Sequence, residues 1–263
     1  MKAKKLILYI SVAITMTINV VAHPCMSPYS YCANNPVRLT DPDGQDYQES
    51  ISKKNRTITL SGTYYTTNED ATSAQKSVDF WNKQSGKFIY RVTNRNNKTD
   101  VTDFKVNFSL SVKKIGESTD DKQKRRLISS HVMEDPNKSG NGYSVTADNN
   151  IKREDSNGYT SQGKLITIKE SKKDASTGAH EVGHTLGLDH FSSGLMTPGE
   201  PDAFRSDEIE ERYIKMIIEN PLKGKITKEG GAPCGKGIIP RESDKIDLEI
   251  YKGTVIKNEQ YNE

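Results

Sequence analysis

Cysteine is scarce in this chain, and its scarcity excludes a scaffold held together by many disulfides. The 263 residues include only 3 cysteines, Cys25, Cys32 and Cys234. In an exported protein an odd count permits at most one internal disulfide and leaves one thiol over, and which two would pair stays open. No C-x-x-C pair occurs, so a structural zinc site built from cysteines is not expected.

An excess of charge of one sign is also lacking. Lys and Arg number 38 against 35 Asp and Glu, and the mean hydropathy is −0.76, which indicates one polar globular domain with appendages. The one basic run, in residues 122–126, follows Asp120 and Asp121 and has no aromatic neighbours. This composition is typical of a solvated loop, so we expect no nucleic-acid partner.

Long apolar runs are absent except at the N-terminus. Three lysines precede an apolar stretch over residues 6–21, and Val20-Val21-Ala22 offers small residues for cleavage. This pattern predicts a signal peptide at residues 1–22 and a secreted protein with no stable membrane association after cleavage. The alternative is an uncleaved anchor through residues 6–21, but that stretch is short for a spanning helix and carries several polar residues.

Histidine is scarce as well, yet three of the 5 histidines lie within HEVGHTLGLDH, residues 180–190. On a helix His180 and His184 lie on one face, one turn apart, so both imidazoles can reach one metal. A third ligand ten residues after the first would be about 15 Å away along a straight helix. Gly187 can adopt the positive φ that turns the chain back, which brings His190 round as the third ligand.

Three protein ligands leave a coordination position for water, which is typical of a catalytic zinc. Glu181 follows the first ligand and need not bind the metal. Its carboxylate can take a proton from the attacking water and pass it to the leaving amine. The alternative is an inactive relic of such a site, although Glu181 is intact.

The pattern H-E-x-x-H-x-x-G-x-x-H, followed by Met196 in GLMTP, resembles the metzincin metallopeptidases. The phrase A-x-x-x-V-x-x-W-N-x-x-S-G over residues 74–86 is similar to the matrixin-like branch. The resemblance implies an α+β fold of zincin type: a twisted mixed sheet, an active-site helix, a Met-turn and a C-terminal helix. It also implies that Met196 packs beneath the metal and that an extended peptide pairs with an edge strand of the sheet.

The chain departs from vertebrate matrixins in two respects. It lacks a full propeptide, and it lacks the extra histidines of their second zinc, so we expect one zinc per chain. We also expect a monomer.

Residues 28–44, PYSYCANNPVRLTDPDG, form a turn-rich segment that resembles the end of the RHS-repeat-associated core of polymorphic toxins. In that family the motif P-x-x-x-x-D-P-x-G precedes a variable toxin domain. Gln45 departs from the pattern, which often has Leu there, and the large repeat shell is absent. The resemblance implies a toxin effector that an immunity protein would neutralise.

The sequence thus predicts four parts: the signal peptide (1–22), the junction segment (23–46), a metallopeptidase domain (47–221) and an unassigned tail (222–263). Alternating or apolar runs predict strands at 57–65, 88–92, 104–112, 143–147 and 165–168. Residues 68–70 start a helix with a core-facing stripe, Ser176-Thr177 caps the metal helix, and a last helix starts at Ser206 and stops before Pro221. Residues 113–141 are expected to be polar loop.

The function expected from the sequence is that of a secreted zinc metalloendopeptidase acting on proteins or peptides, and specifically of a bacterial toxin effector. Two alternatives stay open. One is an ordinary secreted degradative protease, and the other is an inactive surface or binding protein with a relic zinc site.

Overall fold

The computed structural model describes residues 47–94, 96–118, 120–137, 139–152, 156–198, 206–223 and 253–261. The signal peptide (1–22), the junction segment (23–46) and the three cysteines lie outside the described residues, so the interpretations placed on them stay predictions. The described residues all belong to one unit, Pro42–Glu263. Its architecture is a mixed sheet with four α-helices among the described residues, which agrees with the expected α+β class.

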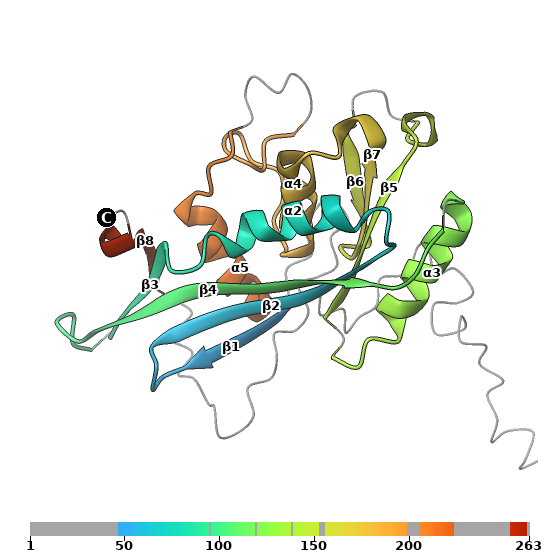
Figure 1. Ribbon diagram of the computed structural model, residues 1–263. Coiled ribbons are helices and arrows are strands. Elements are labelled where there is room, and N and C mark those ends of the chain that lie inside the picture. The colour runs from blue at the N-terminus through green and yellow to red at the C-terminus, as the bar shows by residue number, and fades with distance from the viewer. Residues whose placement is uncertain are drawn as a thin grey trace, which may run out of the picture. The chain divides into compact units, whose positions relative to one another are not determined.

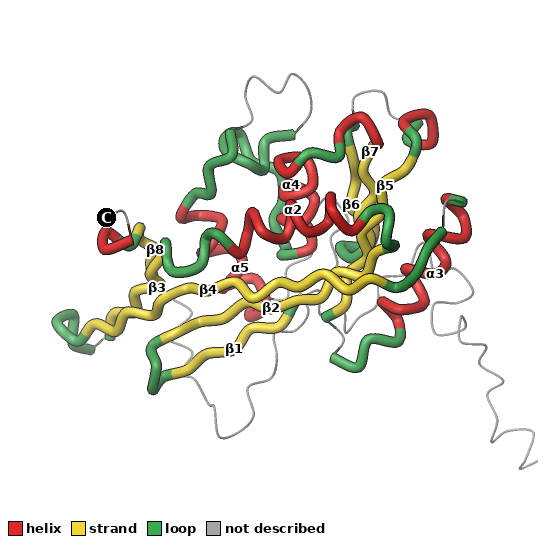
Figure 2. Tube along the Cα trace, viewed as in Figure 1, coloured by secondary structure: helices red, strands yellow, loops and turns green. Residues whose placement is uncertain are grey.

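The sheet has the strand order β6-β7-β5-β2-β4-β3-β8, and β1 pairs with β2 off this path (Figures 1 and 2). The strands are β1 Gln48–Ser52, β2 Thr57–Thr66, β3 Phe88–Thr93, β4 Val101–Lys114, β5 Gly140–Thr146, β6 Gly158–Ser161, β7 Leu165–Lys169 and β8 Thr254–Lys257. The pairs β4–β2, β2–β5 and β5–β7 are parallel, whereas β1, β3, β6 and β8 pair antiparallel with their neighbours.

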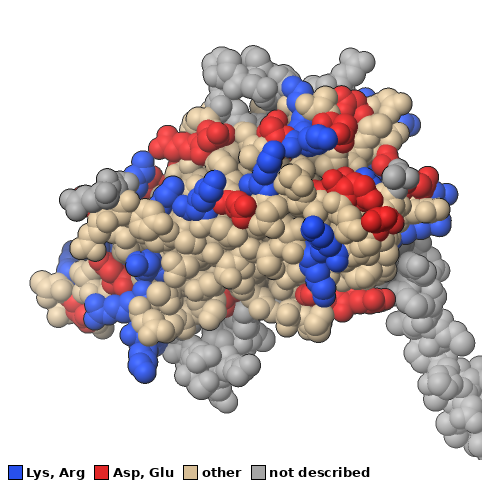
Figure 3. Space-filling model, in the orientation of Figure 1, with Lys and Arg blue, Asp and Glu red and all other residues tan. Residues whose placement is uncertain are grey.

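The helices are α2 Ala71–Asn82, α3 Asp121–Met133, α4 Ala175–Thr185 and α5 Glu211–Lys223. Short 3-10 turns cover Asp148–Asn150, Glu170–Lys172 and Glu259–Tyr261. In the described segments no helix is both long and apolar enough to cross a membrane. On the face in Figure 3, acidic and basic side chains are interspersed, as the balanced composition implies.

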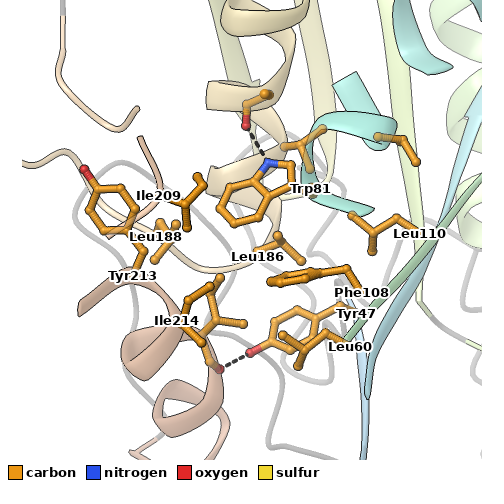
Figure 4. Close-up of a cluster of buried hydrophobic side chains, with 14 of the residues drawn as sticks. Tyr47, Leu60, Trp81, Phe108, Leu110, Leu186, Leu188, Ile209, Tyr213 and Ile214 are labelled. Atoms are coloured by element: carbon orange, nitrogen blue, oxygen red, sulfur yellow. Dashed lines mark hydrogen bonds between the residues drawn. The ribbon is translucent and has the colours of Figure 1, made fainter. Parts of the chain in front are cut away.

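Helix α2 carries the predicted core stripe, and that prediction is confirmed. Ala74, Val78 and Trp81 are fully buried. Figure 4 shows Trp81 between the sheet residues Phe108 and Leu110 and the residues that follow α4. The indole Nε1 of Trp81 donates a hydrogen bond of 2.8 Å to the carbonyl of Ala179, which fixes α2 against α4.

The end of α2 explains the W-N-x-x-S-G phrase. Strand β3 pairs with β4 only over residues 101–105, so farther along this edge of β4 the backbone groups need other partners. Asn82 bonds both the N–H and the carbonyl of Leu110, at 2.9 Å each, and Ser85 does the same for Phe108, at 2.8 and 3.0 Å. Gly86, at φ 82°, donates to the carbonyl of Val106. These residues therefore stand in for a neighbouring strand.

The expectation that residues 113–141 form a polar loop was wrong, because α3 lies there. Asp120 caps it by accepting a 2.7 Å bond from the N–H of Gln123. Lys124, expected to be solvated, is buried, and its Nζ lies 2.9 Å from both Asp70 Oδ2 and the carbonyl of Val145. Burial raises the pKa of Asp70, although the bonds to Val145 and Lys124 oppose this rise. The buried pair thus ties α3 to the residue before α2 and to β5.

Helix α5 also departs from expectation at both ends. It begins at Glu211 rather than near Ser206, and it continues through Pro221 to Lys223. A proline inside a helix leaves the carbonyl four residues earlier without its N–H partner. Here that carbonyl belongs to Ile217, and the hydroxyl of Tyr47 donates to it at 2.6 Å. Tyr47, which lies 170 residues earlier in the sequence, therefore compensates for the missing bond.

Candidate metal centre

Helix α4 presents the histidine motif and begins one turn before it. The side chain of Asp174 accepts a 2.7 Å bond from the N–H of Thr177, so Asp174 is the N-cap, and the expectation that Ser176-Thr177 caps the helix was wrong. Gly178 packs so closely on α2 that a methyl group there would lie 1.8 Å from Ser77 Oγ. The helix is thus seated deep against α2, with residues 177–185 buried.

The turn expected at Gly187 is present. Gly187 has φ 83°, its N–H donates to the carbonyl of His184, and the N–H of Leu188 donates to the carbonyl of Gly183, each at 3.0 Å. This pair of bonds is the Schellman arrangement that ends a helix at a glycine. The chain therefore reverses after α4 and brings His190 back toward the helix.

The three histidines meet at their Nε2 atoms. Nε2 of His190 lies 3.2 Å from Nε2 of His180 and 3.2 Å from Nε2 of His184. One candidate ligand atom from each residue lies within 4.8 Å of the others. Two imidazole nitrogens bound at about 2.0–2.1 Å to one tetrahedral ion are roughly 3.3 Å apart. The spacing fits a single metal ion held by all three residues.

The hydrogen bonds of the Nδ1 atoms show which nitrogen of each ring can bind a metal. Nδ1 of His180 lies 2.7 Å from the carbonyl of Leu195, and Nδ1 of His184 lies 2.8 Å from the carbonyl of Leu188. A carbonyl only accepts, so each Nδ1 carries the hydrogen, and the nitrogen that can offer a lone pair to a metal is Nε2. Lone pairs converging on one point, with Nδ1–H anchored to the backbone, are the arrangement that metal-binding histidines adopt.

Met196 lies under the metal helix and is fully buried. A methyl group on Gly183 would lie only 2.5 Å from Met196 Sδ, so the glycine makes room for the sulfur. The turn that carries Met196, here called the Met-turn (residues 191–197), is closed by a 2.9 Å bond from the N–H of Phe191 to the carbonyl of Met196. The turn therefore packs Met196 against α4 at Gly183, the residue before His184.

Sequence reasoning missed the residues that fix the Met-turn to α5. The hydroxyl of Tyr213 donates to the carbonyl of Ser193, and burial raises the pKa of this tyrosine. The ring of Phe191 lies 4.9 Å from that of Tyr213, and the guanidinium of Arg212 lies 4.8 Å from the Phe191 ring. Tyr213 and Phe191 lie 22 residues apart in the sequence, and no local pattern reveals their contact.

Glu181 is buried beside the first ligand, and only 5% of its surface is exposed. The hydroxyl of Thr160, on β6, lies 2.7 Å from Glu181 Oε2 and 3.1 Å from its carbonyl oxygen. Strand β6 and Thr160 were not predicted, because the four residues Gly-Tyr-Thr-Ser are too short a run to give a strand signal. The structure therefore brings together the three histidines, Glu181, Gly187 and Met196 as the sequence places them, and adds Thr160.

Strand β6 is an edge of the sheet and contacts α4. The N–H of Lys169 donates to the carbonyl of Asn157, which sets the pairing phase between β6 and β7. In an antiparallel pair alternate residues direct their backbone groups to the neighbour, so Asn157, Tyr159 and Ser161 face β7. Gly158 and Thr160 direct theirs outward, and Ser156 Oγ donates to the carbonyl of Gly158.

Comparison of the sequence with protein-family models and with curated proteins gives no match.

Proposed function

We propose that the chain is a zinc-dependent metalloendopeptidase of metzincin type. The observation that carries the proposal is the convergence of three imidazole Nε2 atoms beside a buried glutamate. Two backbone carbonyls fix the tautomers of His180 and His184, so the ligand set is prepared before an ion enters. Strands β1 to β7, helix α4, the Met-turn and helix α5 follow one another in the order that the metzincin resemblance implies, and β8 comes after α5.

Zinc bound by three ligands would supply a Lewis acid that polarises the scissile carbonyl and acidifies a water. The residues of the chain do the rest. Glu181 would accept the proton of the attacking water on its carboxylate and return it to the leaving amine. Burial keeps competing bulk water from this carboxylate, and Met196 gives the centre an apolar floor.

The substrate would be a protein or peptide bound in an extended conformation along β6. The outward backbone groups of Gly158 and Thr160 are placed to form hydrogen bonds with one more strand, either antiparallel or parallel. A bound peptide would replace the hydroxyl of Ser156 on the carbonyl of Gly158. Because Thr160 also contacts Glu181, pairing there would place a peptide bond next to the base.

The test compares Glu181→Gln with the wild type on a fluorogenic peptide library, with a chelator control. The change keeps size and polarity, so the variant should bind zinc and fold normally while turnover falls by at least about 10²–10⁴. Glu170→Gln, on an exposed side chain, is the matched control and should retain full activity. Near wild-type turnover by Glu181→Gln contradicts the mechanism, and a zinc-loaded but inactive wild type favours the relic site.

The biological role that we propose is a secreted toxin effector, active as a monomer and blocked by an immunity protein. The support is the segment 28–44, whose sequence resembles the junction that precedes toxin domains. An ordinary secreted degradative protease would share the same chemistry, and a growth assay separates the two roles.

A further inference from the structure

The contact between Thr160 and Glu181 joins the edge strand to the proposed general base. Thr160 Oγ1 lies 2.7 Å from Oε2 and 3.1 Å from the carbonyl oxygen of Glu181. A threonine hydroxyl has a single hydrogen to donate, and its contact with the carboxylate oxygen is the shorter of the two. The geometry therefore assigns the hydrogen to Oε2.

We infer that Thr160 is a positioning residue that holds the carboxylate of Glu181 in its reactive orientation. This inference rests on the proposed function and names a residue that the motif does not contain. The terminal torsion of a glutamate is broad and roughly two-fold, so an unrestrained carboxylate samples many orientations. A short hydrogen bond to one oxygen restricts that rotation.

The position of Thr160 is itself fixed by the strand. Gly158 lies two residues earlier on the same face of β6, and a methyl group there would lie 3.4 Å from Glu181 Cγ and 2.9 Å from Ile168 Cδ1. The glycine thus lets β6 approach both α4 and β7. Because Thr160 also directs its backbone outward, one residue would align a peptide with its main chain and the base with its side chain.

Two variants of Thr160 test this role. Thr160→Val keeps the shape of the side chain but loses the hydroxyl, and Thr160→Ser keeps the hydroxyl. We expect Thr160→Val to lower kcat by about 10- to 100-fold with little change in KM, since the backbone of β6 is intact. Thr160→Ser should restore kcat to within about threefold of wild type. Thr59→Val, a threonine on β2, is the matched control, and Thr160→Ala replaces Thr160→Val if the latter does not fold.

A second readout does not depend on turnover. In crystal structures of the zinc-loaded proteins, the carboxylate of Glu181 should be rotated or split between conformers in Thr160→Val and in place in Thr160→Ser. If the carboxylate is unmoved and kcat is unchanged in Thr160→Val, the inference about Thr160 is overturned and the proposed function still stands. An inactive wild type overturns the proposed function, and the position of the carboxylate then still decides whether Thr160 orients it.

Discussion

The backbone carbonyl of Leu195 accepts a hydrogen bond from Nδ1 of His180 at 2.7 Å, so the Met-turn orients the first of the three proposed metal ligands. The N–H of the same residue donates to the carbonyl of Glu208 at 3.2 Å. The two backbone hydrogen bonds of Leu195 thus connect His180 to Glu208, in the segment before α5. A change that displaces this segment reaches the metal through the backbone, without touching any ligand side chain.

The ligand set predicts one tightly bound zinc per chain. Elemental analysis of zinc-reconstituted protein should find a single equivalent, and His184→Ala should abolish tight binding because two imidazoles make a weak site. His131→Ala is the control, since this histidine bonds the carbonyl of Leu127 in α3. Two stoichiometric zincs, or none after reconstitution, would refute the prediction.

Gly183→Ala should destabilise the protein although alanine favours helices. The new methyl group would lie 2.5 Å from Met196 Sδ and 3.3 Å from Trp81 Cζ2. Overpacking of this kind costs about 1–3 kcal/mol, against a helix-propensity gain of about 1 kcal/mol. Urea denaturation should show lower stability, and zinc titration should show weaker binding. Ser176→Ala on the same helix should change neither, and an equally stable Gly183→Ala would mean that the floor under the ligands is soft.

The stability of the protein should fall as pH rises from about 5 to 8 because of Glu49. Its Oε1 is buried without a hydrogen-bond partner among the described residues, and burial raises the pKa of Glu49 from 4.5 to about 8. In this pH range the folded state keeps a proton that the unfolded state releases, so a higher pH favours unfolding.

Glu49→Gln removes this charge and should therefore flatten the dependence. At pH 8 the variant should be more stable than wild type by about 1–3 kcal/mol, the usual cost of an unsatisfied buried group, and the two should converge near pH 4.5. Urea denaturation at several pH values measures this difference. Parallel curves for the two proteins would show that the Glu49 carboxyl is solvated.

The toxin role predicts harm to bacteria that depends on the proposed base. Expression of the wild-type chain in the cytoplasm or the periplasm of several hosts should slow growth, and Glu181→Gln should not. Co-expression of a small protein encoded by the neighbouring gene should restore growth. Equal growth with both chains in every host and compartment would leave the degradative protease as the better proposal.

The histidine cluster of the candidate metal centre could be predicted from the sequence because its geometry is local. Two ligands one helical turn apart and a glycine that reverses the chain need no distant partner to bring three imidazoles together. The alternation in residues 104–112 and the stripe on α2 likewise reveal a sheet and a helix that share a core. Each of these signals repeats within a few residues, and each lies where the structure has the element.

The remaining features depend on partners far apart in sequence. Helix α3 carries the buried Lys124, and its partner Asp70 lies more than fifty residues earlier in the sequence. Helix α5 passes through Pro221 because Tyr47 bonds the carbonyl of Ile217. The short, polar β6 is defined by its pairing with β7, and Thr160 gains its role only from that placement. A pattern within a short stretch of sequence does not reveal contacts with residues far away in the chain.

The pairing of β8 with β3 has a consequence for how the protein is made. Residues 254–257, within the segment left unassigned from the sequence, pair with residues 88–91 along the outer edge of β3. During synthesis that edge emerges long before its partner, and an open strand edge is a template for pairing with another chain. The histidine motif leaves the ribosome in the interval between the two strands. A nascent chain can therefore carry its complete ligand set while its sheet is still open to aggregation.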